Sequence, residues 1–261
     1  MHRVSGIRAD ITLMIATIKK KVYQTTVWHK YFKNRTEMDH WMSTVDRITK
    51  WYLGEREYVF PFPSDEKKEK RFTLRKNAIL TYIQVETEDA SYLRDLKLRS
   101  DSFSGLKVAD IGSGPLPTLL VFKDCERYCI DHLIDAYRAL GYPIDEFEAA
   151  THFINAKSED IPLNDGHFDA VISRNALDHV DNFENTAEEI KRVLKPGGYL
   201  HILVNYHPPT SSEPLTLSDE RILYNFGDLD IRKIHEANDA WGFKGGKTVL
   251  WSNLPEHLLT A

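Results

Sequence analysis

Residues 106–117, which read L-K-V-A-D-I-G-S-G-P-L-P, constrain the fold of this chain more than any other segment. An apolar run that ends in two glycines one residue apart is typical of a buried parallel strand that breaks into a tight loop. Gly112 and Gly114 can adopt backbone angles that a Cβ forbids, and they let a ligand approach the main chain. Because ligands of open α/β sheets bind at such strand ends, the segment predicts either a ligand-binding loop or a plain structural turn.

The continuation of this loop bears on which ligand it could hold. A pyrophosphate cradle would have a third glycine at the start of a long helix, or a Lys-Ser/Thr pair. Leu116 and Pro117 stand there instead, and Pro115 and Pro117 stiffen the loop. The loop is therefore poorly suited to a dinucleotide.

Composition and charge exclude several classes of protein. Of the 261 residues, 42% are hydrophobic and 28% charged, as in an ordinary soluble globular protein. The net charge of −5 argues against non-specific binding to nucleic acid or anionic membranes, although residues 67–76 could form a local basic face. The apolar run 11–18 is too short to span a membrane. Cys125 and Cys129 are too few for a disulfide framework or a zinc site, so we expect free thiols, no metal site and a cytoplasmic location.

The first 103 residues predict a helical appendage that serves as a substrate lid or cap. We expect one helix over residues 10–33, a second that Thr36 caps, a third from about residue 74, and a short fourth over 92–98. The apolar stripe of the second helix indicates either core packing or ligand contact. The charged segment 64–71 predicts either a solvated loop or a mobile lid. The first helix could also pair two copies in a homodimer.

Residues 104–261 alternate strand and helix patterns, as a doubly wound α/β fold requires. We expect strands at residues 107–111, 127–130, 152–155, 168–173 and 199–205, a helix at 186–194, and a final pair of strands at 231–235 and 248–251.

Polar residues follow several of these strands. Asp131 ends the second strand, where a carboxylate can accept hydrogen bonds from two ribose hydroxyls, or can cap the following helix. Ser158 and Glu159 follow the third strand and could meet the edge of a planar base. After the fourth strand come Arg174, Asn175, Asp178 and His179; His179 is a candidate general base with Asp178 beside it, or both only position the loop. His207 belongs to a second candidate set after the fifth strand.

The segments V-A-D-I-G-S-G-P, C-I-D-H, S-E-D-I-P-L-N-D-G-H-F-D-A-V-I-S-R-N-A-L-D-H-V and E-I-K-R-V-L-K-P-G-G-Y-L, in this order, resemble the class I S-adenosylmethionine-dependent methyltransferases over residues 100–206. The resemblance implies a Rossmann-like, seven-stranded, mostly parallel sheet with helices on both faces and an antiparallel last strand. It also implies S-adenosylmethionine as cofactor and S-adenosylhomocysteine as product. Leu116 departs from the family, many members of which have glycine there, so the detailed shape of the loop can differ.

The resemblance assigns cofactor contacts to the motif positions. The methionine part would contact the glycine-rich loop, the ribose would contact the acid after the second strand, and adenine would lie at the segment after the third strand. The residues so assigned are Asp110, Gly112, Ser113, Gly114, Asp131, His132, Ser158, Glu159, Arg174 and Asn175.

The leading functional hypothesis is methyl transfer to a small polar acceptor, most of all an oxygen of a sugar or hydroxylated metabolite. His179, Asp178 or His207 would then remove the proton of the acceptor hydroxyl. The alternatives are a catalytically silent scaffold with the same fold and a nicotinamide-dependent oxidoreductase; the missing third glycine counts against the latter.

Overall fold

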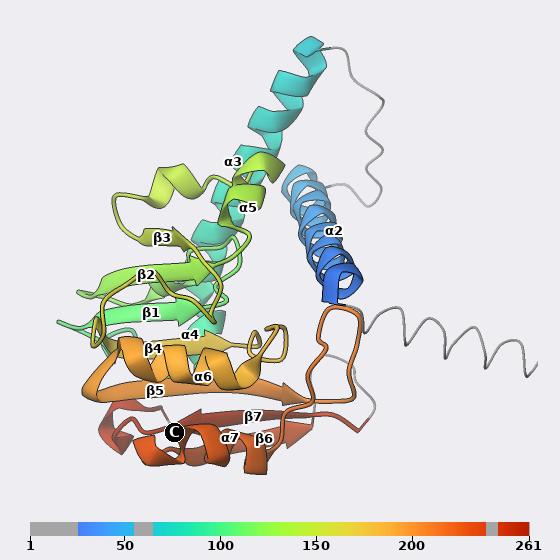
Figure 1. Cartoon of the computed structure of the whole chain (residues 1–261). Helices are drawn as coiled ribbons and strands as arrows, with labels where there is room; N and C mark the ends of the chain where they lie inside the picture. The colour runs from blue at the N-terminus through green and yellow to red at the C-terminus, as the bar shows by residue number, and fades with distance from the viewer. Residues whose placement is uncertain (1–25, 55–64, 239–244, 261) are drawn as a thin grey trace, which may run out of the picture.

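The computed structural model describes residues 26–54, 65–238 and 245–260. A seven-stranded sheet at its centre has the order β3-β2-β1-β4-β5-β7-β6 (Figure 1). The strands are β1 (Lys107–Ile111), β2 (Glu126–Asp131), β3 (His152–Asn155), β4 (Phe168–Arg174), β5 (Leu194–Tyr206), β6 (Arg232–Asn238) and β7 (Lys247–Ser252). The helices are α2 (Thr26–Leu53), α3 (Asp65–Asp89), α4 (Ser91–Leu96), α5 (Ile134–Leu140), α6 (Phe183–Val193) and α7 (Asp219–Phe226).

Strand pairing confirms the expected fold class. β1 to β5 pair in parallel, and β7 lies antiparallel between β5 and β6. From β1 the chain continues to β2 on one side of the sheet and later returns to β4 on the other side. Open α/β sheets bind ligands in the crevice at such a reversal of strand order. The carboxyl ends of β1, β2 and β4 therefore meet at one edge of the sheet.

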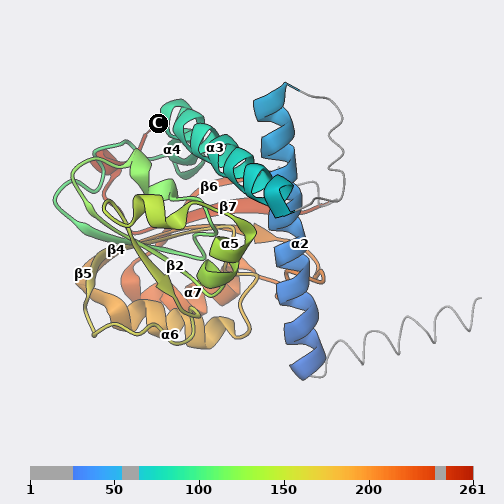
Figure 2. The same cartoon turned by 90° about the horizontal axis from the view of Figure 1, so that it is seen from above.

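Helices cover both faces of the sheet (Figure 2). On one face, α6 and α7 bury Phe183, Ile190 and Phe226 against the sheet. On the other face, α4 packs Tyr92 and Leu96 against strand residues of β1, β4 and β7. Burial of a large apolar side chain contributes roughly 1.5–3 kcal/mol to the stability of the fold. Because Tyr92 and Leu96 are buried in this way, α4 belongs to the core around the sheet, although its residues fall in the N-terminal segment expected from the sequence.

A third apolar cluster joins α2 and α3 to α5. It buries Val45 and Ile48 of α2, Ile79 of α3, and Ile134 and Tyr137 of α5. α2 consequently stands across the carboxyl ends of the strands, as Figures 1 and 2 both show. This position places its inner face opposite the loops that follow β1, β2 and β4.

Two expected helix boundaries were wrong. α2 runs without interruption through Thr36, which therefore caps no helix, because residues 33–36 contain neither proline nor glycine to stop the preceding turns. α3 begins at Asp65 rather than near Leu74, since a run of mixed Lys and Glu is compatible with a solvated helix. Most of the first predicted helix and its homodimer contact lie outside the described residues, as does most of the break before α3. No helix in the described ranges is long and apolar enough to cross a membrane.

Candidate functional site

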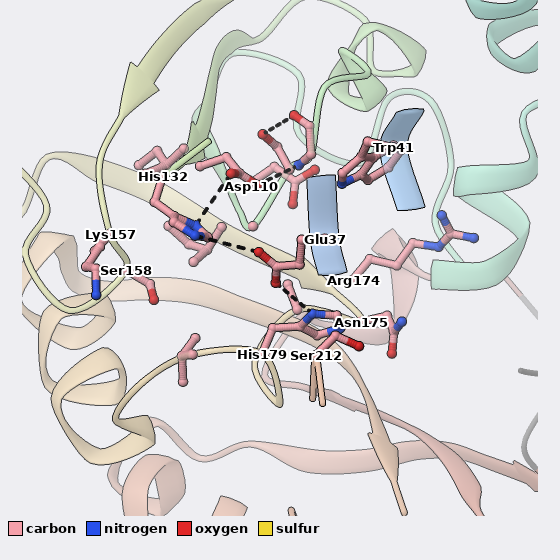
Figure 3. Close-up of a pocket in the computed structure, with 18 of the residues that line it drawn as sticks. Glu37, Trp41, Asp110, His132, Lys157, Ser158, Arg174, Asn175, His179 and Ser212 are labelled. Carbon is pink, nitrogen blue, oxygen red and sulfur yellow. Dashed lines mark hydrogen bonds and ion pairs between the residues drawn. The ribbon is translucent and has the colours of Figure 1, made fainter. Parts of the chain in front are cut away.

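A cavity of about 490 Å³ lies between α2 and the carboxyl ends of β1, β2 and β4 (Figure 3). The motif residues of the sequence analysis contribute most of its sheet side, and α2 contributes the opposite wall. The lining residues proposed from the sequence are Asp110, Gly112, Ser113, Gly114, Asp131, His132, Ser158, Glu159, Arg174, Asn175 and His179. Asp178 and His207 do not line the cavity.

The loop after β1 needs both of its glycines. Gly112 and Gly114 have φ angles of +72° and +64°, which L side chains rarely adopt. A Cβ at Gly112 would lie 2.3 Å from the Cβ of Ala176, and one at Gly114 would lie 2.9 Å from the Trp41 ring of α2. The loop is therefore enclosed by the loop after β4 on one side and by α2 on the other.

Asp131 ties this loop to the start of α5. Its Oδ2 accepts a hydrogen bond from Gly114 N at 3.0 Å, and its Oδ1 accepts one from Leu133 N at 2.8 Å. Burial raises the pKa of Asp131, whereas the neighbouring His132 and the two N–H groups lower it. Each carboxylate oxygen has a second lone pair, so the backbone contacts leave acceptor capacity for a ligand's hydroxyls.

Asp110 is held beneath the loop by two hydroxyl groups. Tyr92 Oη and Thr118 Oγ1 donate to its Oδ2 at 2.7 and 2.8 Å. Burial raises the pKa of Asp110 to about 6, although both hydrogen bonds favour the ionised form. A ligand's ammonium group would favour ionisation further, so this carboxyl suits the amino group of an amino acid.

The side chains of Ser158 and Glu159, which follow β3, form hydrogen bonds with the start of α6 and the residues before it. Glu159 Oε1 accepts hydrogen bonds from the backbone N–H groups of Asp181 and Asn182, directly before α6, at 2.7 and 3.0 Å. Ser158 Oγ lies 3.1 Å from Thr186 Oγ1 in α6. Contact of this segment with a planar base would therefore involve its backbone more than these side chains.

Arg174 and Asn175 occupy the end of β4. Arg174 forms an ion pair with Asp95 and lies over the Tyr92 ring at 5.5 Å. Asn175 has a φ of +52° and accepts a hydrogen bond from Asn205 of β5. These contacts fix the direction in which the chain leaves β4 toward His179.

Glu37 on α2 is a site residue that the sequence analysis missed. Its side chain reaches between the loops after β2 and β4 (Figure 3), with Oε1 3.1 Å from His179 Nδ1 and Oε2 3.6 Å from His132 Nε2. The four-residue spacing of Lys33, Glu37 and Trp41 places all three on the cavity side of α2. In the sequence, however, this spacing could not be distinguished from a solvated helix face.

The carboxylates of Glu37, Asp178 and Glu213 surround the imidazole of His179. Its Nε2 lies 3.9 Å from Asp178 Oδ1 and 3.7 Å from Glu213 Oε1. Burial by itself lowers the pKa of His179, but the hydrogen bond with Glu37 and the charges of Asp178, Glu37 and Glu213 hold that pKa above 6.5. With Nδ1 directed to Glu37, the buried Nε2 is the nitrogen that lies near Asp178 and Glu213, and it has no hydrogen-bond partner among the described residues.

His207 takes a different role in the structure. Its Nε2 lies 2.9 Å from Asp178 Oδ2 and its Nδ1 lies 2.7 Å from the backbone oxygen of Pro208. The hydrogen bond with Asp178 raises the pKa of His207 to about 9. Both nitrogens are engaged and the ring is buried, so His207 contacts Asp178 and Pro208 and does not line the cavity.

Comparisons with known proteins agree with this architecture. A family described as a methyltransferase domain matches residues 110–202. Malonyl-[acyl-carrier protein] O-methyltransferase of Enterobacter lignolyticus is 33% identical over 100 residues, which are 36% of this chain and 37% of that protein. A ubiquinone/menaquinone biosynthesis C-methyltransferase of Pseudomonas paraeruginosa is 34% identical over 92 residues, 35% of this chain and 34% of that protein. This chain thus spans about a third of the length of either relative.

One solved structure extends the likeness beyond the matched segment. An arsenic(III) S-adenosylmethionine methyltransferase from Chlamydomonas reinhardtii has a TM-score of 0.50 and 16% identity, and the match covers 66% of this chain and 73% of that one. At this identity the match shows a shared fold. The family match over residues 110–202 and the shared fold support the resemblance to class I S-adenosylmethionine-dependent methyltransferases seen in the sequence.

Proposed function

We propose that the protein binds S-adenosylmethionine in the cavity beneath α2 and methylates an oxygen of a small polar acceptor, such as a sugar or a hydroxylated metabolite. The observation that carries the proposal is that His179 lines a cavity built on the cofactor motif, and that its buried Nε2 has no hydrogen-bond partner among the described residues. The names of the relatives include both an O- and a C-methyltransferase, so the choice of oxygen rests on this nitrogen.

Bound S-adenosylmethionine supplies a methyl group that its sulfonium has already activated. In our proposal Asp131 receives the ribose hydroxyls and Asp110 receives the amino group of the methionine part. The backbone around Ser158 contacts the adenine edge. These contacts fix the position of the methyl group, and holding two reactants in line is worth roughly 7–11 kcal/mol.

His179 would act on the acceptor. As the hydroxyl oxygen forms its bond to the methyl carbon, the carbon–sulfur bond breaks toward sulfur, and the hydroxyl proton passes to His179 Nε2. Glu37 holds Nδ1 in its protonated form, so that Nε2 is the basic nitrogen. Asp178 and Glu213 would stabilise the imidazolium that forms.

We also propose that α2 and α3 form the cap of the acceptor pocket. Lys33, Asn34, Glu37, His40 and Trp41 of α2 all line the cavity. Their hydrogen-bonding groups suit a polar acceptor, and the helix would exclude water from the reacting atoms.

The test begins with calorimetric titration of the full chain with S-adenosylmethionine and S-adenosylhomocysteine. Micromolar binding that Asp131→Ala loses and Asp135→Ala keeps would support the cofactor site; Asp135 is a matched control because it lies on α5, exposed, and makes its ion pair with Arg138. An acceptor screen with sugars and hydroxylated metabolites follows, in which His179→Ala should lose turnover but retain cofactor affinity. If neither compound binds the intact protein, the proposal fails and the scaffold hypothesis replaces it.

A further inference from the structure

Three potential metal ligands converge beside the cavity, from the loops after β4 and β5. They are Asp178 Oδ1, His179 Nε2 and Glu213 Oε1, and all three atoms lie within 4.8 Å of one another. His179 Nε2 is 3.9 Å from the aspartate oxygen and 3.7 Å from the glutamate oxygen. These separations are too long for direct hydrogen bonds and leave room for a shared ligand between the atoms.

Two of these atoms lack a hydrogen-bond partner within the described residues. Asp178 is completely buried, yet its Oδ1 has none, and neither has the buried Nε2 of His179. A buried polar atom without a partner destabilises the folded state, because it has lost its hydrogen bonds to water and gained none in the protein. Both atoms lie within 4.8 Å of each other and of Glu213 Oε1, so a single bound group could contact all three.

In each of the three residues, the other nitrogen or carboxylate oxygen already has a hydrogen-bond partner, and this contact fixes the orientation of the side chain. His179 Nδ1 is directed to Glu37 Oε1 at 3.1 Å, and Asp178 Oδ2 to His207 Nε2 at 2.9 Å. Glu213 Oε2 accepts a hydrogen bond from Thr210 Oγ1 at 2.6 Å. Metal-binding histidines generally donate their other N–H to a carboxylate, and metal-binding carboxylates are hydrogen-bonded in turn. The cluster therefore has the outer contacts of a metal site.

We propose that Asp178, His179 and Glu213 bind one divalent first-row transition-metal cation. One imidazole nitrogen with two carboxylate oxygens suits Mn²⁺, Fe²⁺ or Zn²⁺ better than Mg²⁺. Neighbouring ligands around a tetrahedral Zn²⁺ lie roughly 3.3 Å apart, so the 3.7 and 3.9 Å separations from His179 Nε2 need to contract by about half an ångström. The two carboxylate oxygens, which lie within 4.8 Å of each other, need to approach as well. We expected no metal site from the sequence.

The remaining coordination positions of the ion would be available to the acceptor. His179 and Glu213 line the cavity, whereas Asp178 lies behind them. If the proposed methyl transfer is correct, an acceptor oxygen can coordinate the same ion. His179 Nε2 would then be a ligand of the ion and would not be the base described under the proposed function; coordination would lower the pKa of the acceptor hydroxyl so that its proton passes to water.

The test is titration of the chelator-treated full chain with Mn²⁺, followed by electron paramagnetic resonance of the free ion. We expect one Mn²⁺ per chain, displaced by Zn²⁺, with affinity lowered by at least about tenfold in Glu213→Gln and in Asp178→Asn. Glu184→Gln is the matched control, because Glu184 pairs with Arg221 away from the cavity. Circular dichroism establishes that each variant is folded; should Asp178→Asn unfold, Glu213→Gln decides.

Two results would overturn the inference: no binding of Mn²⁺ or Zn²⁺ at millimolar concentration, or equal affinity in the folded Glu213→Gln variant. The metal titration is done without cofactor, and the S-adenosylmethionine titration is done with chelator. If only the metal titration shows no binding, the proposed metal site is wrong. If only the S-adenosylmethionine titration shows no binding, the proposed methyl transfer is wrong.

Discussion

Glu37 Oε1 on α2 lies 3.1 Å from Nδ1 of His179, which follows β4. This contact joins the helical cap to the candidate base, and it is one reason why the pKa of His179 lies above 6.5. We expect Glu37→Gln to lower the pKa of His179, because the amide keeps the size of the side chain but removes its charge. Histidine NMR of chelator-treated protein measures the change directly.

The same variant should lower turnover by roughly ten- to a hundredfold once an acceptor is known, with cofactor affinity nearly unchanged. Asp39→Asn serves as control, since Asp39 is exposed on the same helix and pairs only with Arg35 among the ion pairs of the described chain. An unaltered His179 titration in Glu37→Gln would show that the contact has no electrostatic consequence.

Gly112→Ala should destabilise the protein by at least about 1–3 kcal/mol, because the residue has a φ of +72°. Its new Cβ would also meet the Ala176 Cβ at 2.3 Å. Adding Ala176→Gly should recover part of the loss by removing that clash. Denaturant unfolding measures both variants, with Gly227→Ala as control: Gly227 has a φ of −63° and open space around it. Equal losses in the single and double variants would contradict the proposed clash.

The buried Lys33 of α2 forms an ion pair with Asp181, before α6, at 3.1 Å. Lys33→Ala should loosen α2 from the site, because it removes the buried Lys33 end of this ion pair, whereas the partly exposed Asp181 keeps its second ion pair with Lys157. Hydrogen exchange of the described part of α2 should increase, while β1 and β4 stay protected. Arg35→Ala changes an exposed residue two positions away and should have little effect. Unchanged exchange in Lys33→Ala would mean that the apolar cluster with α5 alone holds α2.

His201 is fully buried in β5, where its nitrogens contact Ser252 Oγ and the backbone oxygen of Leu96. Burial lowers the pKa of His201 to about 4, so the folded state favours the neutral imidazole more strongly than the unfolded state does. The resulting stability is complete above pH 6.5 and is lost as the pH falls toward 4, by up to about 3 kcal/mol.

The free energy of unfolding, measured by denaturant titration across this pH range, tests the effect. His201→Gln should be less stable at neutral pH but should have a shallower decline in acid. A variant that declines as steeply as the natural protein would assign the acid sensitivity to other groups.

The positions of the strands, the glycine loop and the clustering of motif residues at one edge of the sheet could all be predicted from the sequence. Apolar periodicity and turn residues act over a few positions, and parallel strands bring their carboxyl ends to the same edge whatever the loops contain. β1 and β3 consequently have the predicted bounds. The predicted end of the first helix was wrong, since no proline or glycine separates the two predicted segments that are joined in α2.

Tertiary structure alone decided which side chains meet. Glu37, His179 and Glu213 are far apart in the chain and come together only because α2 packs on α5 while the loops after β4 and β5 fold beneath it. Likewise, only packing separates the roles of two histidines that follow neighbouring strands: His179 lines the cavity, and His207 is buried against Asp178. Local sequence sets where a strand ends, but burial and the partners supplied by distant segments set what the residue after it can do.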